Sequence, residues 1–293
     1  MLKIAIIKKL LFSKKICFIN NSLQYLCLKE YLNLKLNLNN NNIVFFASYP
    51  ASKDLVQLKN TIKYFKKSDI NIIFLKDIFQ IKIIHLILKI KKFFLNKYDL
   101  VILGDYKYYL YRELHKLSNK TVYLDDGVST LDYNYWSKYY NIQNSNSKFF
   151  TFFNLKIKIP TKKNKFIFLK SLSKKKKIDN SITILGEALV EKGLVNKNYF
   201  IGLIKSIVKK NINKKILYYP HRKEKIIHQI KKNYKNLYII KNKYNAETNI
   251  IDNSYISKNI YGISTTALVT LKIILDGYKT INFFNINIDR DGF

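Results

Sequence analysis

The stretch Ile216-Leu217-Tyr218-Tyr219-Pro220-His221-Arg222-Lys223-Glu224 is the one from which the fold and the function are interpreted. Its first four residues form an apolar run that is typical of a buried strand, and Pro220 ends that run. In an open α/β sheet, ligands bind at the carboxyl ends of the strands. A histidine placed there can donate a proton or hold an anion near neutral pH. The stretch predicts either a functional His221 or a histidine that only hydrogen-bonds its own loop.

A second stretch, Gly262-Ile263-Ser264-Thr265-Thr266-Ala267-Leu268, predicts a hydroxyl-rich turn before a helix. Residues 269–275 keep a helical apolar pattern, and Gly277 is typical of a helix C-terminus. Ser264 is the predicted N-cap of that helix. Free backbone N–H groups, the helix dipole and three hydroxyl groups favour an anion site here. The alternative is an ordinary cap without a ligand.

The composition indicates a folded protein with an unusual charge. The chain has 293 residues, of which 48% are hydrophobic, and it contains 23 Tyr and 19 Phe. This is enough for one large or two medium domains and argues against a disordered chain. The formal net charge is +34, which is typical of proteins that bind nucleic acid or an anionic membrane. Because the excess is nearly all Lys, scattered and accompanied by Asn and Ile, we interpret it first as AT-rich codon usage, then as affinity for anionic lipid, and third as nucleic-acid binding.

Targeting and redox signals are few. Cys17 and Cys27 are the only cysteines, too few for a disulfide scaffold, and no Cys/His cluster has zinc spacing, so a reducing compartment fits. The N-terminal region is lysine-rich and has no small-residue cleavage site, which argues against a signal peptide. No uncharged apolar run approaches the roughly 18 residues that a bilayer crossing needs. We therefore expect a soluble or peripheral protein.

In the first half, predicted strands alternate with predicted helices, which indicates a Rossmann-like α/β domain. The strands are expected at residues 16–19, 43–48, 71–75, 100–103 and 121–124. The helices are expected at residues 23–32 (with Ser22 as cap), 54–65, 81–95 and 106–117. The amphipathic helix 81–95 either packs on the sheet or serves a membrane surface. Two acidic turns, Gly104-Asp105 and Asp125-Asp126-Gly127, end neighbouring strands and suggest one cleft edge.

The second half restarts the same pattern after a change in composition. Pro160 and the lysine runs 162–163 and 174–177 predict a basic linker over residues 156–180. Further strands are expected at residues 182–185, 215–219, 237–240 and 281–284, with a helix at 198–209 and residues 255–262 leading into the hydroxyl-rich turn. Two such halves, 1–155 and 181–293, predict an α/β fold of the GT-B kind, with two Rossmann-like domains facing a central cleft. The helix that usually closes this fold is not visible before Phe293.

Five segments of the chain carry a joint resemblance, namely Phe18-Ile19-Asn20-Asn21-Ser22-Leu23-Gln24-Tyr25-Leu26, Asp125-Asp126-Gly127, Ile184-Leu185-Gly186-Glu187-Ala188-Leu189-Val190-Glu191-Lys192-Gly193, Tyr218-Tyr219-Pro220-His221-Arg222-Lys223-Glu224 and Gly262-Ile263-Ser264-Thr265-Thr266-Ala267-Leu268. Together they resemble glycosyltransferase family 52, the bacterial lipooligosaccharide sialyltransferases, which are related to bacterial polysialyltransferases. The resemblance runs over about residues 16–285. It departs from the family at Arg222, where related enzymes have Pro, at Glu187, where Gln is common, and mildly at Thr266.

The resemblance implies an inverting transfer of sialic acid from CMP-sialic acid to a sugar hydroxyl, typically galactose on a lipid-linked oligosaccharide. Such a reaction needs a base for the hydroxyl and stabilisation of the departing phosphate. The first domain would be the acceptor side, with Asp126 as the base and the adjacent Asp125 raising its pKa by like-charge repulsion. The alternative for this pair is an Asp-Gly turn with Asx hydrogen bonds.

The second domain would bind the CMP-sugar. The resemblance implies that His221 protonates or hydrogen-bonds the leaving phosphate, and that Ser264, Thr265 and Thr266 hold it. Glu247, 26 positions after His221 (247 − 221), would bind the ribose; the alternative is a solvated surface Glu. Gly186 would let the backbone approach the nucleotide. Arg222 would either contact phosphate or pair with Glu224. The scheme requires no metal and no cofactor besides the donor.

Partners and alternatives follow from the same expectations. We expect a cytoplasmic protein with peripheral contact to the anionic inner membrane of a bacterium and no nucleic-acid partner, while a homodimer stays open. The enzyme alternatives are a capsule polysialyltransferase, a transferase for another sugar nucleotide, or a degenerate inactive transferase. The non-enzyme alternative is a basic nucleic-acid-binding protein, although the chain lacks a helix-turn-helix, a zinc finger or an aromatic RNA-binding signature.

Overall fold

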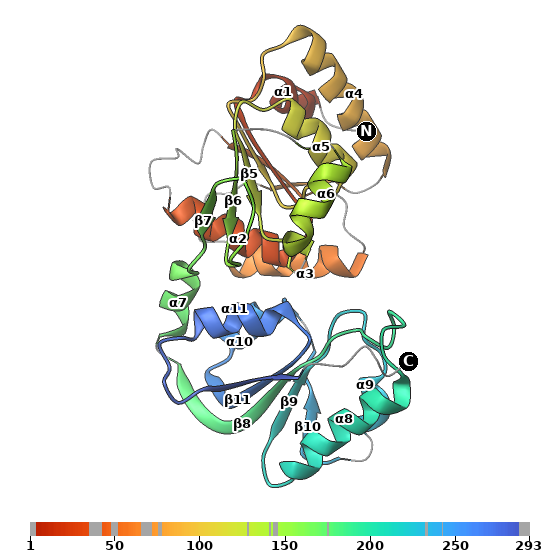
Figure 1. Cartoon of the computed structure of the whole chain (residues 1–293), viewed down its shortest axis with the longest axis vertical. Helices are drawn as coiled ribbons and strands as arrows, with labels where there is room; N and C mark the ends of the chain where they lie inside the picture. Colours follow the sequence, from red (N-terminus) through yellow and green to blue (C-terminus); the bar gives the residue numbers. More distant parts are fainter. Residues whose placement is uncertain are drawn as a thin grey trace. The chain divides into compact units, whose positions relative to one another are not determined.

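The chain folds into two compact units, Met1–Lys165 and Phe166–Phe293. The computed structural model describes residues 4–34, 43–47, 52–65, 72–75, 78–127, 129–140, 142, 146–174, 176–231, 234–241 and 243–286. Each unit holds one sheet of parallel strands with helices on both faces, which is a Rossmann-like α/β architecture (Figure 1). Ser48 and Asn71, predicted as strand ends, lie outside the described residues.

The first sheet has the order β3-β2-β1-β4-β5-β6-β7, and all its neighbours are parallel. Its strands are β1 (Lys15–Ile19), β2 (Ile43–Ala47), β3 (Ile72–Phe74), β4 (Leu100–Leu103), β5 (Thr121–Leu124), β6 (Ser147–Thr151) and β7 (Thr161–Lys163). β4 and β5 are buried throughout, because helices cover both faces of the sheet. The strand order reverses between β1 and β4, and such a reversal opens a crevice at the carboxyl ends.

Helices cover the two faces of the first sheet unequally (Figure 1). One face carries α1 (Ile4–Phe12), α4 (Ile78–Phe94), α5 (Tyr109–Lys116) and α6 (Tyr133–Tyr139), which follows a short 3-10 turn, η2 (Ser129–Asp132). The other carries α2 (Ser22–Leu34) and α3 (Ser52–Tyr64). Aromatic pairs fill the first face, with Phe18 stacked on Phe46 at 4.7 Å and Tyr123 on Phe149 at 5.2 Å between ring centroids. The sequence did not predict α1.

The second sheet repeats the arrangement with the order β10-β9-β8-β11-β12. Its strands are β8 (Lys177–Leu185), β9 (Ile216–Tyr219), β10 (Leu237–Ile239), β11 (Tyr255–Ile263) and β12 (Asn282–Ile286). One face carries α8 (Lys197–Lys210) and α9 (Ile227–Lys231), and the other carries α7 (Ile167–Ser173), α10 (Ala246–Asp252) and α11 (Thr266–Ile274) (Figure 1). The order again reverses, here between β8 and β11.

Residues 156–180, predicted as a basic linker, are largely built into the two units. β7 adds an edge strand to the first sheet, α7 packs against α10 and α11, and Lys177 already begins β8. The two units meet in sequence at Lys165 and Phe166. Phe166 and Leu169 are fully buried, so apolar burial outweighs the lysine-rich local composition from which a linker was predicted.

Two predicted helix caps are each displaced by one residue. Asn21, not Ser22, caps α2, since Asn21 Oδ1 accepts a hydrogen bond from Gln24 N at 3.0 Å. Thr265, not Ser264, caps α11, since Thr265 Oγ1 accepts from Ala267 N at 3.3 Å. Ser264 has φ of 45°, which is incompatible with the extended backbone of an N-cap residue. Both caps still lie at the predicted strand-to-helix turns.

Membrane and redox expectations can be compared with the described part of the chain. Within it, no helix combines the length and the apolar character that a bilayer crossing requires. Cys17 and Cys27 are both buried, and they form no disulfide with each other. Burial raises the pKa of the Cys17 thiol far above its usual range. These cysteines therefore act as small core residues.

Gly262, at the end of β11, provides a stability test of the contact between β11 and α11. A Cβ at this position would lie 2.6 Å from Leu268 Cβ, so α11 would have to shift. We expect Gly262→Ala to lower the free energy of unfolding by about 1–3 kcal/mol, as overpacking does. The matched control is Gly202→Ala on exposed α8, where an added Cβ meets nothing within 4 Å; it should stabilise the chain by about 0.5–1 kcal/mol. Urea unfolding of both variants measures the two effects, and equal shifts would contradict this packing.

Candidate functional site

The predicted site residues leave the carboxyl edges of the two sheets. In the first sheet, β1, β4 and β5 are neighbours in register, so the residues that follow them emerge at one edge. These residues are Asn20-Asn21, Gly104-Asp105 and Asp125-Asp126. In the second sheet, Leu185 is paired with Tyr219 on one side and with Gly262 on the other. His221, Gly186 and Ser264 therefore leave the second sheet at one edge, on three adjacent strands.

Asp126 is held by amide groups from the first turn of α2. Asn21 Nδ2 and Gln24 Nε2 both donate to Asp126 Oδ1, each at 2.7 Å. The same two side chains also secure the start of the helix, because Asn21 Oδ1 caps Gln24 N and Gln24 Oε1 accepts from Asn20 N at 2.7 Å. Within the described residues, Asp126 Oδ2 accepts no hydrogen bond. One carboxylate oxygen is therefore fixed and the other is available to a ligand.

The electrostatic surroundings of Asp126 keep its proton unusually tightly bound. Burial is the main cause, and the nearby Asp105 carboxylate adds to it; together they raise the pKa of Asp126 to about 7, against the hydrogen bonds from Asn21 and Gln24. The pKa of Asp105 is itself raised by burial. The predicted like-charge neighbour, Asp125, is not among the causes of the shift at Asp126. Asp105 takes that role, from the next strand.

Asp125 has a structural position. Its carboxylate accepts from Thr151 Oγ1 at 2.6 Å and from Phe152 N at 2.8 Å, so it ties the end of β5 to the end of β6. It is fully buried, and burial raises its pKa to about 7 despite these hydrogen bonds. Its carboxylate is turned toward β6, while that of Asp126 is turned toward α2. The two acidic neighbours in sequence therefore do not form a joint site.

His221 lies two residues after the end of β9, and its hydrogen bond defines the position of its proton. Its Nδ1 accepts from Lys223 N at 3.3 Å, so a neutral ring carries its hydrogen on Nε2. Burial lowers the pKa of His221, and the nearby Arg222 adds to this, whereas Glu187 opposes it. His221 Nε2 lies 3.7 Å from Glu187 Oε1, which is also bound by Lys192 Nζ at 2.8 Å. The ring is therefore a neutral donor at the edge of the sheet.

Glu224 holds the backbone of the His221 loop, a role that the sequence pattern did not predict. It accepts from Tyr218 OH at 2.6 Å and from His221 N at 3.0 Å. Burial raises its pKa to about 8. A Cβ on Gly186 would lie 2.3 Å from Glu224 Oε2, so only glycine leaves room for this buried carboxyl. The sequence predicted that Gly186 lets the backbone approach a nucleotide. In the structure, the missing side chain of Gly186 leaves space for the Glu224 carboxyl group.

The hydroxyl-rich turn begins α11, and Glu247 contacts Thr270 in the same helix. Ser264 is exposed with φ of 45°, a strained conformation for a residue other than glycine. Glu247, predicted either as a ribose ligand or as a solvated residue, is buried: Thr270 Oγ1 donates to its Oε1 at 2.6 Å and Asn245 Nδ2 to its Oε2 at 2.7 Å. Burial raises its pKa. Thr270 lies one turn after Thr266, so Glu247 packs against the first part of α11.

The structure thus brings the predicted residues together in two groups, one in each unit. Asp126 belongs to the first group together with Asp105, whose turn was predicted to share its edge of the sheet, and the structure adds Asn21 and Gln24. His221, Gly186 and the turn from Ser264 to Thr266 lie at one edge of the second sheet, with Glu187 and Glu224 added. Glu247 belongs to the same unit but contacts Thr270 and Asn245. Two sequence signals point to residues of the first group. Asn20-Asn21 is an amide pair directly after the predicted strand 16–19, and Asp105 is an acidic residue after the predicted strand 100–103. The described residues contain no group of three or more His, Cys, Asp and Glu side chains suited to a metal ion.

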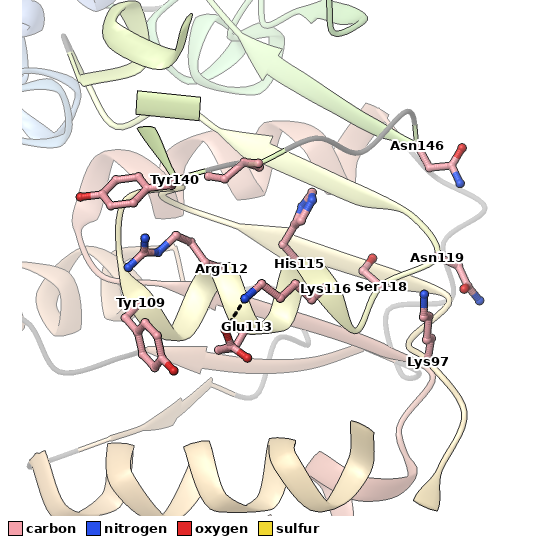
Figure 2. A pocket seen from close by; sticks show the side chains of 11 residues that line it. Lys97, Tyr109, Arg112, Glu113, His115, Lys116, Ser118, Asn119, Tyr140 and Asn146 are labelled. Atoms are coloured by element: carbon pink, nitrogen blue, oxygen red, sulfur yellow. Dashed lines mark hydrogen bonds and ion pairs between the residues drawn. The ribbon is translucent and has the colours of Figure 1, made fainter. Parts of the chain in front are cut away.

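A cavity of about 460 Å³ lies elsewhere in the first unit, at the opposite edge of its sheet (Figure 2). Its lining residues precede β4, β5 and β6 or belong to α5, and they include Lys97, Ser118 and Asn146. Figure 2 shows Arg112 between Tyr109 and Tyr140, and its guanidinium carbon lies 3.9 Å from the centroid of the Tyr140 ring. None of the predicted site residues lines this cavity. In open parallel sheets ligands bind at the carboxyl edge, so we place the candidate site there.

No family model matches the chain, and a search of curated proteins gives no match either.

The raised pKa of Asp126 predicts a measurable pH dependence of stability. The folded chain keeps this proton up to about pH 7, whereas an unfolded Asp loses it near pH 3.9. Between these values the folded state binds the extra proton, so the contribution of Asp126 to stability falls as the pH rises toward 7. Asp126→Asn cannot lose a proton. We expect it to be more stable than the wild type by about 1–2 kcal/mol at pH 8 and nearly equal at pH 4.

Urea unfolding at the two pH values measures this difference, and the exposed Asp99→Asn is the control, for which no such gain is expected. Asp125 and Glu224 shift stability in the same direction, but they remain in both proteins and cancel in the comparison. A destabilised Asp126→Asn protein at pH 8 would show that Asp126 serves stability rather than function.

Proposed function

We propose that the chain is an inverting glycosyltransferase that moves sialic acid from CMP-sialic acid to a sugar hydroxyl. The proposed fold is of the GT-B kind, which has two Rossmann-like domains. The observation that carries the proposal is Asp126. It is a carboxyl group with a pKa of about 7, at the end of β5, one strand away from the β1–β4 pair where the strand order reverses, and it is fixed through one oxygen only. A general base works best when its pKa is near the working pH.

In the proposed reaction Asp126 Oδ2 accepts the proton of the acceptor hydroxyl as that oxygen attacks the anomeric carbon. The bond from that carbon to the CMP phosphate breaks in the same displacement, which inverts the anomeric centre. Asn21 and Gln24 hold Oδ1 and thereby fix the direction of Oδ2. Such positioning supports catalysis because the reacting groups need no search for the right orientation.

The leaving CMP phosphate is assigned to the second unit. His221 carries its proton on Nε2 when neutral, so it donates a hydrogen bond to a phosphate oxygen. A bound phosphate raises the pKa of the ring and allows proton transfer as the negative charge develops. The hydroxyl groups of Ser264, Thr265 and Thr266 at the start of α11 provide further donors, and the dipole of this helix favours an anion there. His221 and Ser264 follow strands that flank β8 on its two sides, about 10 Å apart by strand spacing.

The nucleoside is assigned to the side of α11. Glu247 packs against this helix, and Thr270 and Asn245 each occupy one lone pair of its carboxyl oxygens. Binding of the two ribose hydroxyls is proposed for this carboxyl group, and it requires the group, which is buried in the structure, to open toward the nucleoside. The acceptor is proposed to be a galactose of a lipid-linked oligosaccharide at the cytoplasmic face of a bacterial membrane. Repeated transfer, as in a polysialyltransferase, uses the same chemistry.

The two adjacent carboxyl groups allow a sharp test of the base. Asp126→Asn should lower kcat by about a hundredfold to ten-thousandfold with little change in the KM for the donor, because the proton acceptor is lost while CMP binding lies elsewhere. The wild-type kcat should also fall on the acid side with an apparent pKa near 7, since Asp126 must be ionised. Steady-state kinetics with CMP-sialic acid and lactose measures both effects.

Asp125→Asn is the matched control for this experiment. Because Asp125 accepts from Thr151 Oγ1 and Phe152 N, the variant should unfold more easily, while kcat of its folded fraction stays close to that of the wild type. The opposite pattern, in which Asp125→Asn loses kcat and Asp126→Asn keeps it, would show that Asp126 is not the base. It would thereby remove the main support for the proposal.

A donor panel tests the substrate class. Hydrolysis and transfer should be detected with CMP-sialic acid and not with UDP-glucose, UDP-galactose or UDP-N-acetylglucosamine. EDTA should leave the rate largely intact, because His221 and the donors at the start of α11 stabilise the leaving phosphate in this scheme. Product formation is followed by mass spectrometry. Turnover of a UDP-sugar alone would replace the proposed donor, and complete loss of activity with EDTA would contradict the assigned roles.

A further inference from the structure

The helix α4 presents two different apolar faces. One face packs into the core of the first unit, where Ile84, Ile87 and Leu88 are buried. The opposite face is exposed and also apolar, which a helix covering a sheet does not need. Its exposed large side chains are Phe79, Leu86, Ile90, Phe93 and Phe94. Positions 79, 86, 90 and 93 are separated by seven, four and three residues, so they form one stripe along the helix.

The exposure of these side chains is large. Phe93 and Phe94 are 75% and 80% exposed, and Phe79 is 64% exposed. Single exposed apolar residues are ordinary on a protein surface, but a contiguous apolar stripe marks a binding surface. The stripe of α4 therefore calls for a partner that accepts apolar side chains.

The helix α1 extends this surface. α1 packs against α4, and Lys91 Nζ donates to Leu11 O at 2.6 Å across the contact. Tyr98 OH fixes the same end of α1 by donating to Leu10 O at 2.6 Å. Figure 1 shows the two helices as neighbours in the first unit. α1 adds the exposed Ile4 and Phe12, which are 73% and 69% exposed. We call the outward surfaces of these two helices the α1–α4 face.

The charges of the α1–α4 face have one sign. Neither helix contains an Asp or a Glu residue. Exposed lysines lie among the apolar side chains, namely Lys8 and Lys9 on α1 and Lys82, Lys89 and Lys92 on α4. Lys91 differs from these, because it is buried over the Tyr98 ring and burial lowers its pKa. The face thus combines mobile cationic groups with aromatic and aliphatic side chains.

We propose that the α1–α4 face docks on the surface of a bilayer that contains anionic lipid. Aromatic and aliphatic side chains would enter the boundary between head groups and acyl chains, and the lysines would bind the lipid phosphates. A second copy of the chain is a poor partner, since two surfaces rich in lysine and lacking carboxylates repel one another. Nucleic acid would use the lysines but would leave the exposed Phe side chains in water.

Membrane docking goes beyond the proposed transferase activity and is tested separately from it. Wild-type protein is mixed with vesicles of phosphatidylcholine alone, or with about a quarter of phosphatidylglycerol, and the bound fraction is measured by sedimentation. Binding should require the anionic lipid and weaken from about 0.1 M to about 0.5 M salt. This readout needs no sugar nucleotide, so a failed donor assay does not affect it.

Two sets of substitutions test the two components of the face. Phe93→Ser/Phe94→Ser should lower the partition coefficient about tenfold or more, because two large apolar side chains no longer enter the bilayer. Lys82→Gln/Lys89→Gln/Lys92→Gln should lower it by about fivefold for each lysine. Urea unfolding confirms that each variant is folded. Wild-type binding by either variant would overturn the proposal.

Matched substitutions at exposed positions of α8 and just after it serve as controls. Tyr199→Ser/Ile212→Ser and Lys197→Gln/Lys209→Gln/Lys210→Gln remove side chains of the same kinds from the second unit. Both should leave vesicle binding within about twofold of the wild type, since surface charges beyond a Debye length contribute little. A loss as large as that of the α4 variants would show that binding follows total charge, and would overturn the proposal.

A second readout detects insertion directly. In a Trp136→Phe background, Phe94→Trp places the only tryptophan of the chain on the α1–α4 face. Phosphatidylcholine with brominated acyl chains, mixed with phosphatidylglycerol, should quench its fluorescence. Absence of quenching in protein that sediments with the vesicles would show that another surface binds the lipid.

Discussion

The two amide hydrogen bonds to Asp126 Oδ1 are the constraint on which the first unit depends. They require the first turn of α2, the end of β4 and the end of β5 to meet at one point. Gln24 can reach Asp126 only because position 104 is glycine, since a Cβ there would lie 1.9 Å from Gln24 Oε1. Asn21 must cap α2 with one atom and hold the carboxylate with another. Helix start and acidic site are therefore one structure, and neither can move without the other.

In the second unit, too, a buried carboxyl group fixes the loop at the end of a strand, but with different residues. Glu224 is the buried carboxyl group there, and it joins Tyr218 of β9 to the backbone of His221. Gly186, at the end of the neighbouring strand, leaves the space that this carboxyl group occupies. Burial raises the pKa of Glu224 to about 8, which costs stability at neutral pH. Buried titratable groups of this kind gather where function outweighs stability, and here they lie at the carboxyl edges of both sheets.

Much of the fold could be predicted from the sequence, because the buried strands are short apolar runs with helical patterns between them. The runs that became β1, β4, β5 and β9 are of this kind. The shared edge of Asp105 and Asp126 was predicted from the acidic turns at two neighbouring strand ends, whereas the individual side-chain contacts between distant segments were not predicted. Asp125 and Asp126 are adjacent in sequence, but successive residues of an extended chain point to opposite sides, so the charged neighbour of Asp126 is Asp105 from another strand. Glu247 was predicted either as a ligand or as a solvated residue because the short helix α10, which buries it, leaves little periodic signal.

The net charge of +34 is a weak guide to partners because it does not say where the charges lie. Lysines occur on most surfaces of the chain, so their number alone cannot distinguish lipid from nucleic acid. The position of exposed apolar side chains is more informative, since lysine-rich drift in composition does not place Phe93 and Phe94 in water. For helix 81–95 the pattern offered packing on the sheet or contact with a membrane as alternatives. The inner face of α4 is committed to the core, and its outer face keeps the features of the second alternative, so a helix of this length can serve both.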